Sequence, residues 1–259
     1  MELEEVGRTL DSVTERGFRS RATHAYGTIR RMVRDRVCFR EARILDFGCG
    51  EGIAAVAFAL RLPGATVFGS DIIPPQIPQL KNKLTRLTGL EVPANLTILD
   101  TTEGTLPGHV VDLDLVYAWS VFEHIEFSCL THNMALIRSR LAPGGIFALQ
   151  INPLFFSPRG GHLYRSHSEP WAHLLYPTSV LRQLVMASPL PERRKLRGWK
   201  QYETLNRATA DDILDAARAA GFKIAEEKRF ETTLDPPERL LSAYTGNALI
   251  IEEIRLVLA

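Results

Sequence analysis

Residues 46–52, DFGCGEG, place two carboxylates, Asp46 and Glu51, among three glycines at alternate positions. A glycine turn between a strand and a helix lets the backbone approach a ligand closely, as in dinucleotide-binding turns. The spacing differs from GxGxxG, because Ile53 stands where that pattern has Gly or Ala. Asp46 and Glu51 would also repel a pyrophosphate in a partly desolvated crevice. The stretch therefore favours a ligand with a positive end and no phosphate.

S-adenosylmethionine (SAM) has these properties, since it carries an ammonium, a sulfonium, a ribose and an adenine but no phosphate. In this interpretation Asp46 pairs with the ammonium. Gly48 and Gly50 let the backbone, with Cys49 between them, approach the methionyl part. The alternative is that the three glycines only make a tight turn between a strand and a helix.

At five motifs the chain resembles the class I SAM-dependent methyltransferases. They occur in family order within residues 42–152, as DFGCGEG, FGSDI, LTILDTT, DLVYAWSVFEHI and LAPGG. The resemblance implies cofactor contacts from the ends of the second, third and fourth strands. Asp71 would bind the ribose hydroxyls, with Ile72 against the adenine; Asp100 and Thr101 would face the adenine amino group; Trp119 and Ser120 would line the pocket. Asp71 as a helix cap and Asp100 as a turn residue are the plainer alternatives.

The elements that must position these residues alternate along the chain. Apolar runs typical of strands are separated by segments with helical periodicity, which indicates a parallel sheet covered on both faces. Expected strands cover 43–47, 65–70, 96–99, 114–119, 146–151, 222–231 and 248–259, and expected helices cover 54–60, 78–87, 129–141, 209–222 and 236–244. With the resemblance, this is an α/β fold: a Rossmann-like, doubly wound, mostly parallel seven-stranded sheet with an antiparallel last strand.

Two segments fall outside this alternation. Residues 1–41 have helical spacing and are expected to form one or two helices, a helical cap ahead of the methyltransferase domain at 42–259. Residues 153–207 are irregular and rich in Pro, Gly, His and aromatic residues, which indicates an insertion after strand five. Ligands of such sheets bind at the carboxyl ends of the strands, so we expect 153–207 to cover an acceptor.

Methyl transfer from a sulfonium mainly requires an aligned acceptor, and a base only when the acceptor is a hydroxyl or a protonated amine. Histidine suits that task near neutral pH. Our candidates are His124, His162 and His167, although His124 could instead orient a loop. Candidate acceptor contacts are Tyr164, Trp171 and His173, whose aromatic rings could alternatively pack on the core. No metal is expected, because the histidine spacing does not place ligands on one helical face and no HExxH occurs.

The composition limits the kinds of molecule that the protein is expected to bind. The net charge is +1, from 31 basic and 30 acidic residues, so no overall field attracts nucleic acid, although 193–200, RRKLRGWK, is a local basic patch. The chain has no transmembrane run or signal peptide, and Cys38, Cys49 and Cys129 are too scattered for a disulfide framework. We expect a cytoplasmic methyltransferase acting on an O or N atom of a small molecule. An RNA methyltransferase and a noncatalytic scaffold that keeps the SAM fold are the alternatives, and the oligomeric state stays open.

Overall fold

The computed structural model describes residues 2–102 and 104–259. The chain divides into two units, and each is formed from separate stretches of sequence. Unit 1 comprises Met1–Trp119, Ala135–Leu149 and Val257–Ala259. Unit 2 comprises Ser120–Met134 and Gln150–Leu256.

Unit 1 is built on four parallel strands, β1 (Arg43–Phe47), β2 (Thr66–Asp71), β3 (Leu96–Asp100) and β4 (Leu113–Trp119). Asp46 lies level with Tyr117 of β4, and Asp71 lies level with Asp100 of β3. The carboxyl ends of parallel neighbours meet at one sheet edge, so the register gathers three acids of the predicted motifs there. β1 and β4 are almost continuously buried, as expected for strands covered on both faces.

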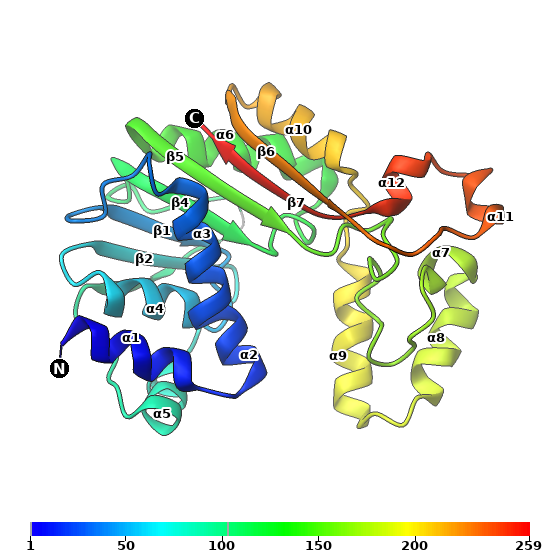
Figure 1. Cartoon of the computed structure of the whole chain (residues 1–259), viewed down its shortest axis with the longest axis horizontal. Coiled ribbons are helices and arrows are strands. Elements are labelled where there is room, and N and C mark those ends of the chain that lie inside the picture. The colour runs from blue at the N-terminus through cyan, green and yellow to red at the C-terminus, as the bar shows by residue number, and fades with distance from the viewer. Residues whose placement is uncertain (1, 103) are drawn as a thin grey trace. The chain divides into compact units, whose positions relative to one another are not determined.

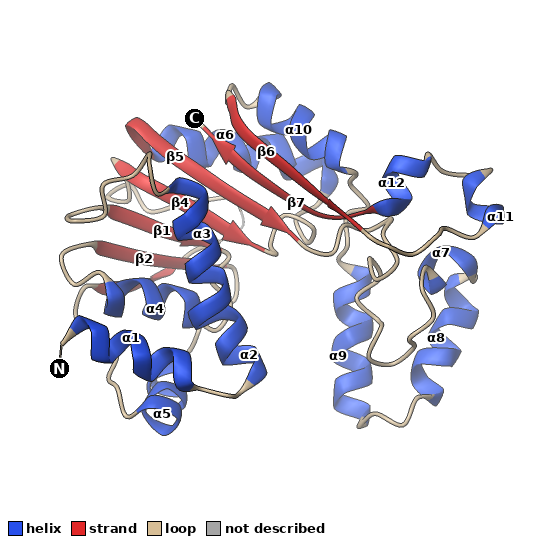
Figure 2. Ribbon diagram, viewed as in Figure 1, coloured by secondary structure: helices blue, strands red, loops and turns tan. Residues whose placement is uncertain are grey.

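Helices pack around these strands within unit 1 (Figures 1 and 2). They are α1 (Leu3–Ser12), α2 (Arg16–Arg19), a π-helical segment (Ser20–Ala25), α3 (Tyr26–Val33), α4 (Ile53–Arg61) and α5 (Ile77–Thr88). Helix α4 is buried over its first seven residues, because its sequence IAAVAFA is apolar on every face. It contacts β1, β2 and the π-helical segment, so it fixes where the β1–α4 turn begins.

Unit 2 holds the remaining helices and its own apolar clusters. A 3₁₀ turn (Phe127–Cys129) leads into α6 (Leu130–Arg140), and β5 (Leu141–Ile151) follows, so both α6 and β5 contribute residues to both units. Then come α7 (Ala172–Leu175), α8 (Thr178–Ala187), α9 (Glu192–Glu203), α10 (Ala210–Ala219), β6 (Ile224–Glu231), α11 (Glu238–Leu241), α12 (Gly246–Ile250) and β7 (Ile251–Leu258). A core cluster including Phe155, Leu181 and Trp199 joins α8 and α9 to the chain after β5.

The seven strands have the order β3-β2-β1-β4-β5-β7-β6, with β7 antiparallel. This confirms the predicted fold class. No helix in the described residues is long and apolar enough to span a bilayer.

Four element predictions differ from the structure. Strand β5 begins at Leu141, so LAPGG (141–145), expected as the turn before the strand at 146–151, belongs to the strand. The N-terminal segment forms α1, α2, the π-helical segment and α3 in place of one or two helices. Residues 153–207, predicted as irregular, contain α7, α8 and α9. The last strand begins at Ile251, and the apolar residues 248–250 belong to α12. Such short apolar runs fit a strand or a buried helix equally well by periodicity.

Candidate cofactor site and histidine cluster

The turn between β1 and α4 is held open by backbone hydrogen bonds. Gly48, Gly50 and Gly52 have φ of 76°, 54° and 75°, the left-handed region that favours glycine. The N–H groups of Gly48 and Cys49 donate to the Ser70 carbonyl at 2.7 and 2.8 Å. No atom lies within 4 Å of a Cβ built on Gly50, so the turn leaves free space beside its backbone.

Asp46 lies beneath this turn and is 3% exposed. Its Oδ2 atom has no partner at ordinary hydrogen-bond geometry in the described part of the chain, although the buried Tyr117 hydroxyl of the neighbouring strand lies close enough to act on this carboxyl. Burial raises the pKa of Asp46 to about 7, although the Tyr117 hydroxyl and the Arg21 guanidinium oppose the shift. A buried carboxylate with an unmet oxygen beside a glycine turn fits an ammonium group. The residues present therefore fit the positive end of SAM.

Asp71 ends β2 and ties the turn to that strand. Its Oδ2 accepts from the Gly50 N–H at 2.8 Å, and its Oδ1 accepts from the Ile73 N–H at 2.9 Å. Each carboxylate oxygen keeps a second lone pair for a ligand hydroxyl. Helix α5 has Gln76 as its N-cap, so Asp71 does not cap it.

Exposed apolar surface and a polar pair flank Asp71. Ile72 is 63% exposed and follows the carboxylate directly, as the resemblance requires for an adenine contact. Thr101 is buried, and its hydroxyl donates to the Asp71 carbonyl at 3.1 Å, whereas Asp100 is exposed. The structure thus brings Asp71, Asp100 and Thr101 together at the ends of β2 and β3.

Trp119 ends β4 and is 7% exposed. Its carbonyl accepts from Arg21 Nη1 at 3.0 Å, and its ring meets His24 edge-on at 5.6 Å. The same arginine lies close enough to Asp46 to lower the pKa of that carboxyl. Sequence reasoning missed Arg21, because it is one of many arginines in residues 1–41 and no motif marks it.

Ser120 belongs to unit 2, where a polar network holds it. Its φ is 53°, and its hydroxyl lies 3.1 Å from Gln150 Oε1 and 3.3 Å from the Asn152 carbonyl. Gln150 and Asn152 donate in turn to the carboxylate of the buried Glu253. The surroundings of Ser120 within this unit are thus fixed by side chains of β5 and β7.

Two of the three candidate bases lie together in unit 2. The rings of His124 and His162 meet edge-on with centroids 5.3 Å apart. His124 Nδ1 lies 2.8 Å from Thr204 Oγ1, and His162 Nε2 lies 3.5 Å from the Pro153 carbonyl. Burial lowers the pKa of His124 to about 4, with a further contribution from His162, and burial also lowers the pKa of His162. Both rings are therefore neutral at pH 7.

His167 belongs to a different group. Its Nε2 lies 3.1 Å from Glu169 Oε2, an oxygen that also accepts from the Tyr176 hydroxyl at 2.7 Å. The hydrogen bond from Tyr176 is the main cause that lowers the pKa of Glu169. His167 is thus a hydrogen-bonding side chain beside an exposed carboxylate.

The candidate acceptor contacts differ in accessibility. Tyr164 is 39% exposed and receives a hydrogen bond from Arg165 Nε at 3.3 Å. Trp171 is 2% exposed, and its indole N–H donates to the Leu249 carbonyl, so it packs in the core of unit 2. His173 is 9% exposed and donates from Nε2 to the Phe155 carbonyl at 2.6 Å. Of the three, Tyr164 has the most open ring.

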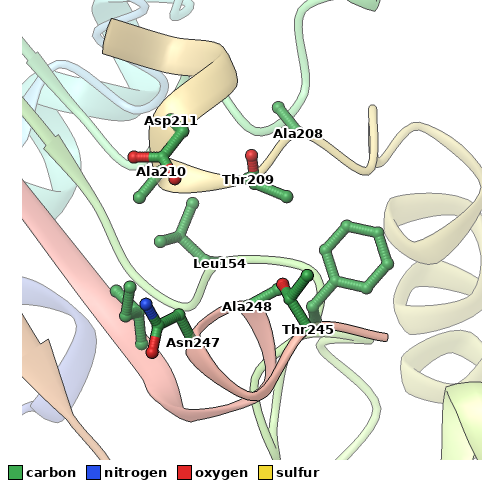
Figure 3. Close-up of a pocket in the computed structure, with 10 residues that line it drawn as sticks. Leu154, Ala208, Thr209, Ala210, Asp211, Thr245, Asn247 and Ala248 are labelled. Atoms are coloured by element: carbon green, nitrogen blue, oxygen red, sulfur yellow. The ribbon is translucent and has the colours of Figure 1, made fainter. Parts of the chain in front are cut away.

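A cavity of about 80 Å³ lies elsewhere in unit 2 (Figure 3). The first turn of α10, the start of α12 and the chain after β5 form its walls. Its lining residues are Leu154, Phe156, Ala208, Thr209, Ala210, Asp211, Thr245, Asn247, Ala248 and Ile251. None of the residues predicted from the sequence lines it. A second cavity, beside Tyr164, His167 and His173, has about 10 Å³, too little for more than a water molecule.

Within the described residues, no group of three or more His, Cys, Asp or Glu side chains could hold a metal ion. The cysteines are all free: Cys49 is buried, Cys38 is exposed and Cys129 is half-buried. Burial raises the pKa of the Cys49 thiol, with Asp46 and Asp71 adding to the shift. Cys49 is therefore a neutral thiol under the glycine turn.

The sheet order, the open glycine turn and the acids at the strand ends define a class I SAM-dependent methyltransferase, and SAM is its cofactor. The family model described as "Methyltransferase domain" matches residues 18–227, and the chain belongs to this family.

Curated relatives and solved structures agree with this class. Trans-aconitate 2-methyltransferase from Methylobacterium radiotolerans is 29% identical over 215 residues, which are 78% of this chain and 75% of the relative. The protein of the same name from Rhodopseudomonas palustris is 29% identical over 217 residues, or 79% and 77% of the two chains. Magnesium protoporphyrin IX methyltransferase from Synechocystis, solved with bound SAH, has a TM-score of 0.56 at 14% identity, over 98% of this chain and 92% of that one.

Proposed function

We propose that this methyltransferase transfers the methyl group of SAM to an oxygen or nitrogen atom of a small-molecule acceptor. The observation that carries the proposal is the buried Asp46 carboxylate beside the open glycine turn, whose Oδ2 has no partner at ordinary hydrogen-bond geometry among the described residues. The relatives support a small acceptor, since their name specifies trans-aconitate. The net charge of +1 supports it too, because the chain has no field that would gather a polyanion.

Four side chains of unit 1 would hold the cofactor. Asp46 would pair with the ammonium of SAM. Arg21 donates one N–H to the Trp119 carbonyl, and its other N–H groups would face the carboxylate that SAM carries beside its ammonium. Asp71 would accept from the ribose hydroxyls, and Ile72 would cover the adenine. When bound, SAM supplies a methyl group already activated by the positive sulfur.

The acceptor side would be provided by residues 153–207 together with His124. Because both His124 and His162 are neutral at pH 7, either ring can accept a proton from an acceptor hydroxyl or amine. The segment would also exclude water, which raises the strength of each polar contact to the acceptor. Tyr164, the most exposed of the candidate aromatic residues, is the side chain that we expect the acceptor to touch.

Two alternatives remain to be tested. An RNA methyltransferase could use the exposed arginines of α9, although Lys195 in this patch donates to the Met186 carbonyl within the protein. Binding to RNA would then weaken steeply with salt. A noncatalytic scaffold would not require a destabilising carboxylate such as Asp46, so the raised pKa at this position favours an active cofactor site.

Calorimetry tests the cofactor site. We expect wild-type protein to bind SAM, and Asp71→Asn to bind it at least about tenfold more weakly, a loss of roughly 1.4 kcal/mol. The control is Asp35→Asn, at an exposed residue that pairs with its neighbour Arg34. Equal affinities of wild type and Asp71→Asn would contradict the assigned site.

Methyl-labelled SAM tests the acceptor class. The protein is incubated in parallel with a small-metabolite extract and with total RNA. We expect label in the metabolite fraction. Label only in RNA would support the alternative enzyme, and label in neither fraction, despite SAM binding, would support a scaffold.

A further inference from the structure

The segment that follows α9 holds His124 at two points. Thr204 is the C-cap of α9, and its hydroxyl contacts the imidazole of His124. Asn206 lies two residues further on and contacts the backbone around the same histidine. Neither residue belongs to a sequence motif. Thr204 contacts His124 across 80 positions of the chain, and Asn206 contacts Phe122 across 84. The contacts therefore bring together residues that sequence patterns do not connect.

The proton positions in this group follow from two contacts of 2.8 Å. Thr204 Oγ1 lies at that distance from the Gln201 carbonyl and from His124 Nδ1. A hydroxyl has one proton, and a carbonyl oxygen can only accept. If Thr204 donated to Nδ1, two oxygens without a proton between them would face each other at 2.8 Å. Both contacts are hydrogen bonds only when Thr204 donates to Gln201 and His124 donates from Nδ1.

This arrangement leaves Nε2 as the nitrogen with a lone pair in the neutral ring. Among the described residues Nε2 has no hydrogen-bond partner, and the ring is only half-buried. His162 is the titratable side chain packed against it. Because burial and His162 keep the pKa of His124 low, the lone pair on Nε2 is present throughout the neutral range.

Asn206 fixes the backbone that carries this ring. Its side-chain amide donates to the carbonyls of Phe122 and Ile125 at 2.6 and 2.7 Å. Its own backbone N–H donates to the Glu123 carbonyl at 3.0 Å, and its Oδ1 accepts from the Ala208 N–H. Every polar group of the Asn206 side chain is used, so the turn on either side of His124 is held from the same short segment.

We infer that Thr204 and Asn206 are positioning residues that hold His124 with Nε2 free to accept a proton, and that the acceptor presents an O–H or N–H group, unlike the ionised carboxylates of trans-aconitate, the acceptor in the relatives' name. This rests on the proposed function. The acceptor O–H or N–H bond breaks as its heteroatom bonds to the methyl carbon, and the C–S bond breaks with its electron pair left on sulfur. The proton goes to Nε2, and the resulting imidazolium returns it to water. An acceptor that is an ionised carboxylate has no proton to donate. Its oxygen would face the lone pair on Nε2, which is unfavourable.

Nitrogen-15 NMR of the histidine side chains tests the positioning without any turnover. His124→Gln assigns the signals. In the wild type we expect Nδ1 protonated and Nε2 bare. Thr204→Val keeps the shape but removes the hydroxyl, so we expect the proton to move largely to Nε2, whereas Thr204→Ser retains the wild-type pattern. A protonated Nε2 in neutral wild-type protein, or an unchanged pattern in Thr204→Val, would overturn the inference.

Kinetics and product analysis test the consequence for methyl transfer. Thr204→Val should lower kcat at least about tenfold, within the range of general-base effects, with SAM affinity unchanged by calorimetry and kcat restored in Thr204→Ser. Equal kcat in Thr204→Val and wild type would count against the inference. The labelled product should carry its methyl on an oxygen or nitrogen that bore a proton, and a methyl ester made from an ionised carboxylate would overturn the acceptor class. If no acceptor is found, the proposed function fails, but the NMR result still decides the positioning.

Discussion

At the scale of single residues, the buried charge of Asp46 lowers the stability of the folded protein, and we propose that the same charge binds the cofactor. Its pKa in the folded protein is about 7, above its unfolded value of 3.8. Its contribution to stability is therefore present below pH 3.8 and is lost as pH rises through 7, where a charge must be kept in the interior. The shift corresponds to at most about 4 kcal/mol.

We predict that Asp46→Asn stabilises the ligand-free protein at pH 8 by about 2 kcal/mol, because the amide carries no charge, and weakens SAM binding at least tenfold. Urea unfolding and calorimetry measure the two effects. Asp100→Asn, at an exposed position on the neighbouring strand end, should change the free energy of unfolding by less than about 0.5 kcal/mol. A loss of stability in Asp46→Asn at pH 8 would contradict this account of the buried charge.

The residues of the cofactor site differ in how far sequence could predict them. Asp46, Asp71 and Thr101 lie at or just after the ends of strands within recognisable motifs, so their positions at one sheet edge follow from the alternation of elements. Arg21 reaches the Trp119 carbonyl across 98 positions of sequence. Thr204 reaches His124 across 80 positions. Such contacts depend on tertiary packing, and no local pattern encodes them.

At the scale of elements, Arg61 at the end of α4 fixes the N-terminal helices. Its side chain is 9% exposed, pairs with Asp11 of α1 at 2.6 Å and donates to the Ala22 carbonyl at 2.8 Å. Its guanidinium also lies 4.5 Å from the centre of the Tyr26 ring. One side chain therefore joins α1, the π-helical segment and α3 to α4.

We predict that Arg61→Met lowers the free energy of unfolding by about 2 kcal/mol, since it leaves the Ala22 carbonyl without its donor. It should also weaken SAM binding, because the segment it releases carries Arg21. Urea unfolding and amide exchange of residues 3–25 measure these effects. Arg8→Met breaks only an exposed pair with Glu4 and should cost less than about 0.5 kcal/mol. Equal effects of the two substitutions would refute this role for Arg61.

The elements of the sheet were more predictable than those of residues 153–207. Strands β1 to β4 are short, mostly apolar runs, of which β2 and β3 end in Asp, and their type follows from period and length. Helices α8 and α9 are amphipathic, but Pro177, Pro191 and the aromatic residues around them suggested loops. The prolines precede the first helical residues as N-caps, a position compatible with a missing N–H. They begin these helices instead of breaking them.

At the scale of the whole molecule, acid stability combines groups with opposite signs. His124 and His173 have pKa values lowered to about 4, and that of His162 is also lowered, chiefly by burial. A histidine with a depressed pKa binds protons more readily when unfolded, so its stabilising effect is lost as pH falls from 6.5 towards 4. For His173 alone the shift corresponds to about 3 kcal/mol. The contribution of Asp46 to the free energy of unfolding rises as the pH falls over the same interval.

We predict that the free energy of unfolding of the wild type falls by less between pH 7 and pH 4.5 than that of Asp46→Asn, because the gain from Asp46 offsets part of the loss from the histidines. In Asp46→Asn the compensation is absent, so the free energy of unfolding should fall by about 3 kcal/mol or more over that range. Urea unfolding at half-unit pH steps measures both curves. His132→Gln, at an exposed position, is the control and should follow the wild type. Parallel curves for wild type and Asp46→Asn would contradict the opposing signs.

The chain passes between the two units at four places, and this limits how such an enzyme can exchange parts by recombination. Three of the passages fall inside α6, β5 and β7, and the fourth follows the last residue of β4. A transplant of unit 2 from a relative would need both 120–134 and 150–256, with junctions that keep the strand register of β5 and β7. A single crossover would join mismatched halves of these strands. Under the proposed function, in which residues 153–207 contact the acceptor, new acceptor specificity should therefore arise by point substitution more readily than by exchange of a cassette.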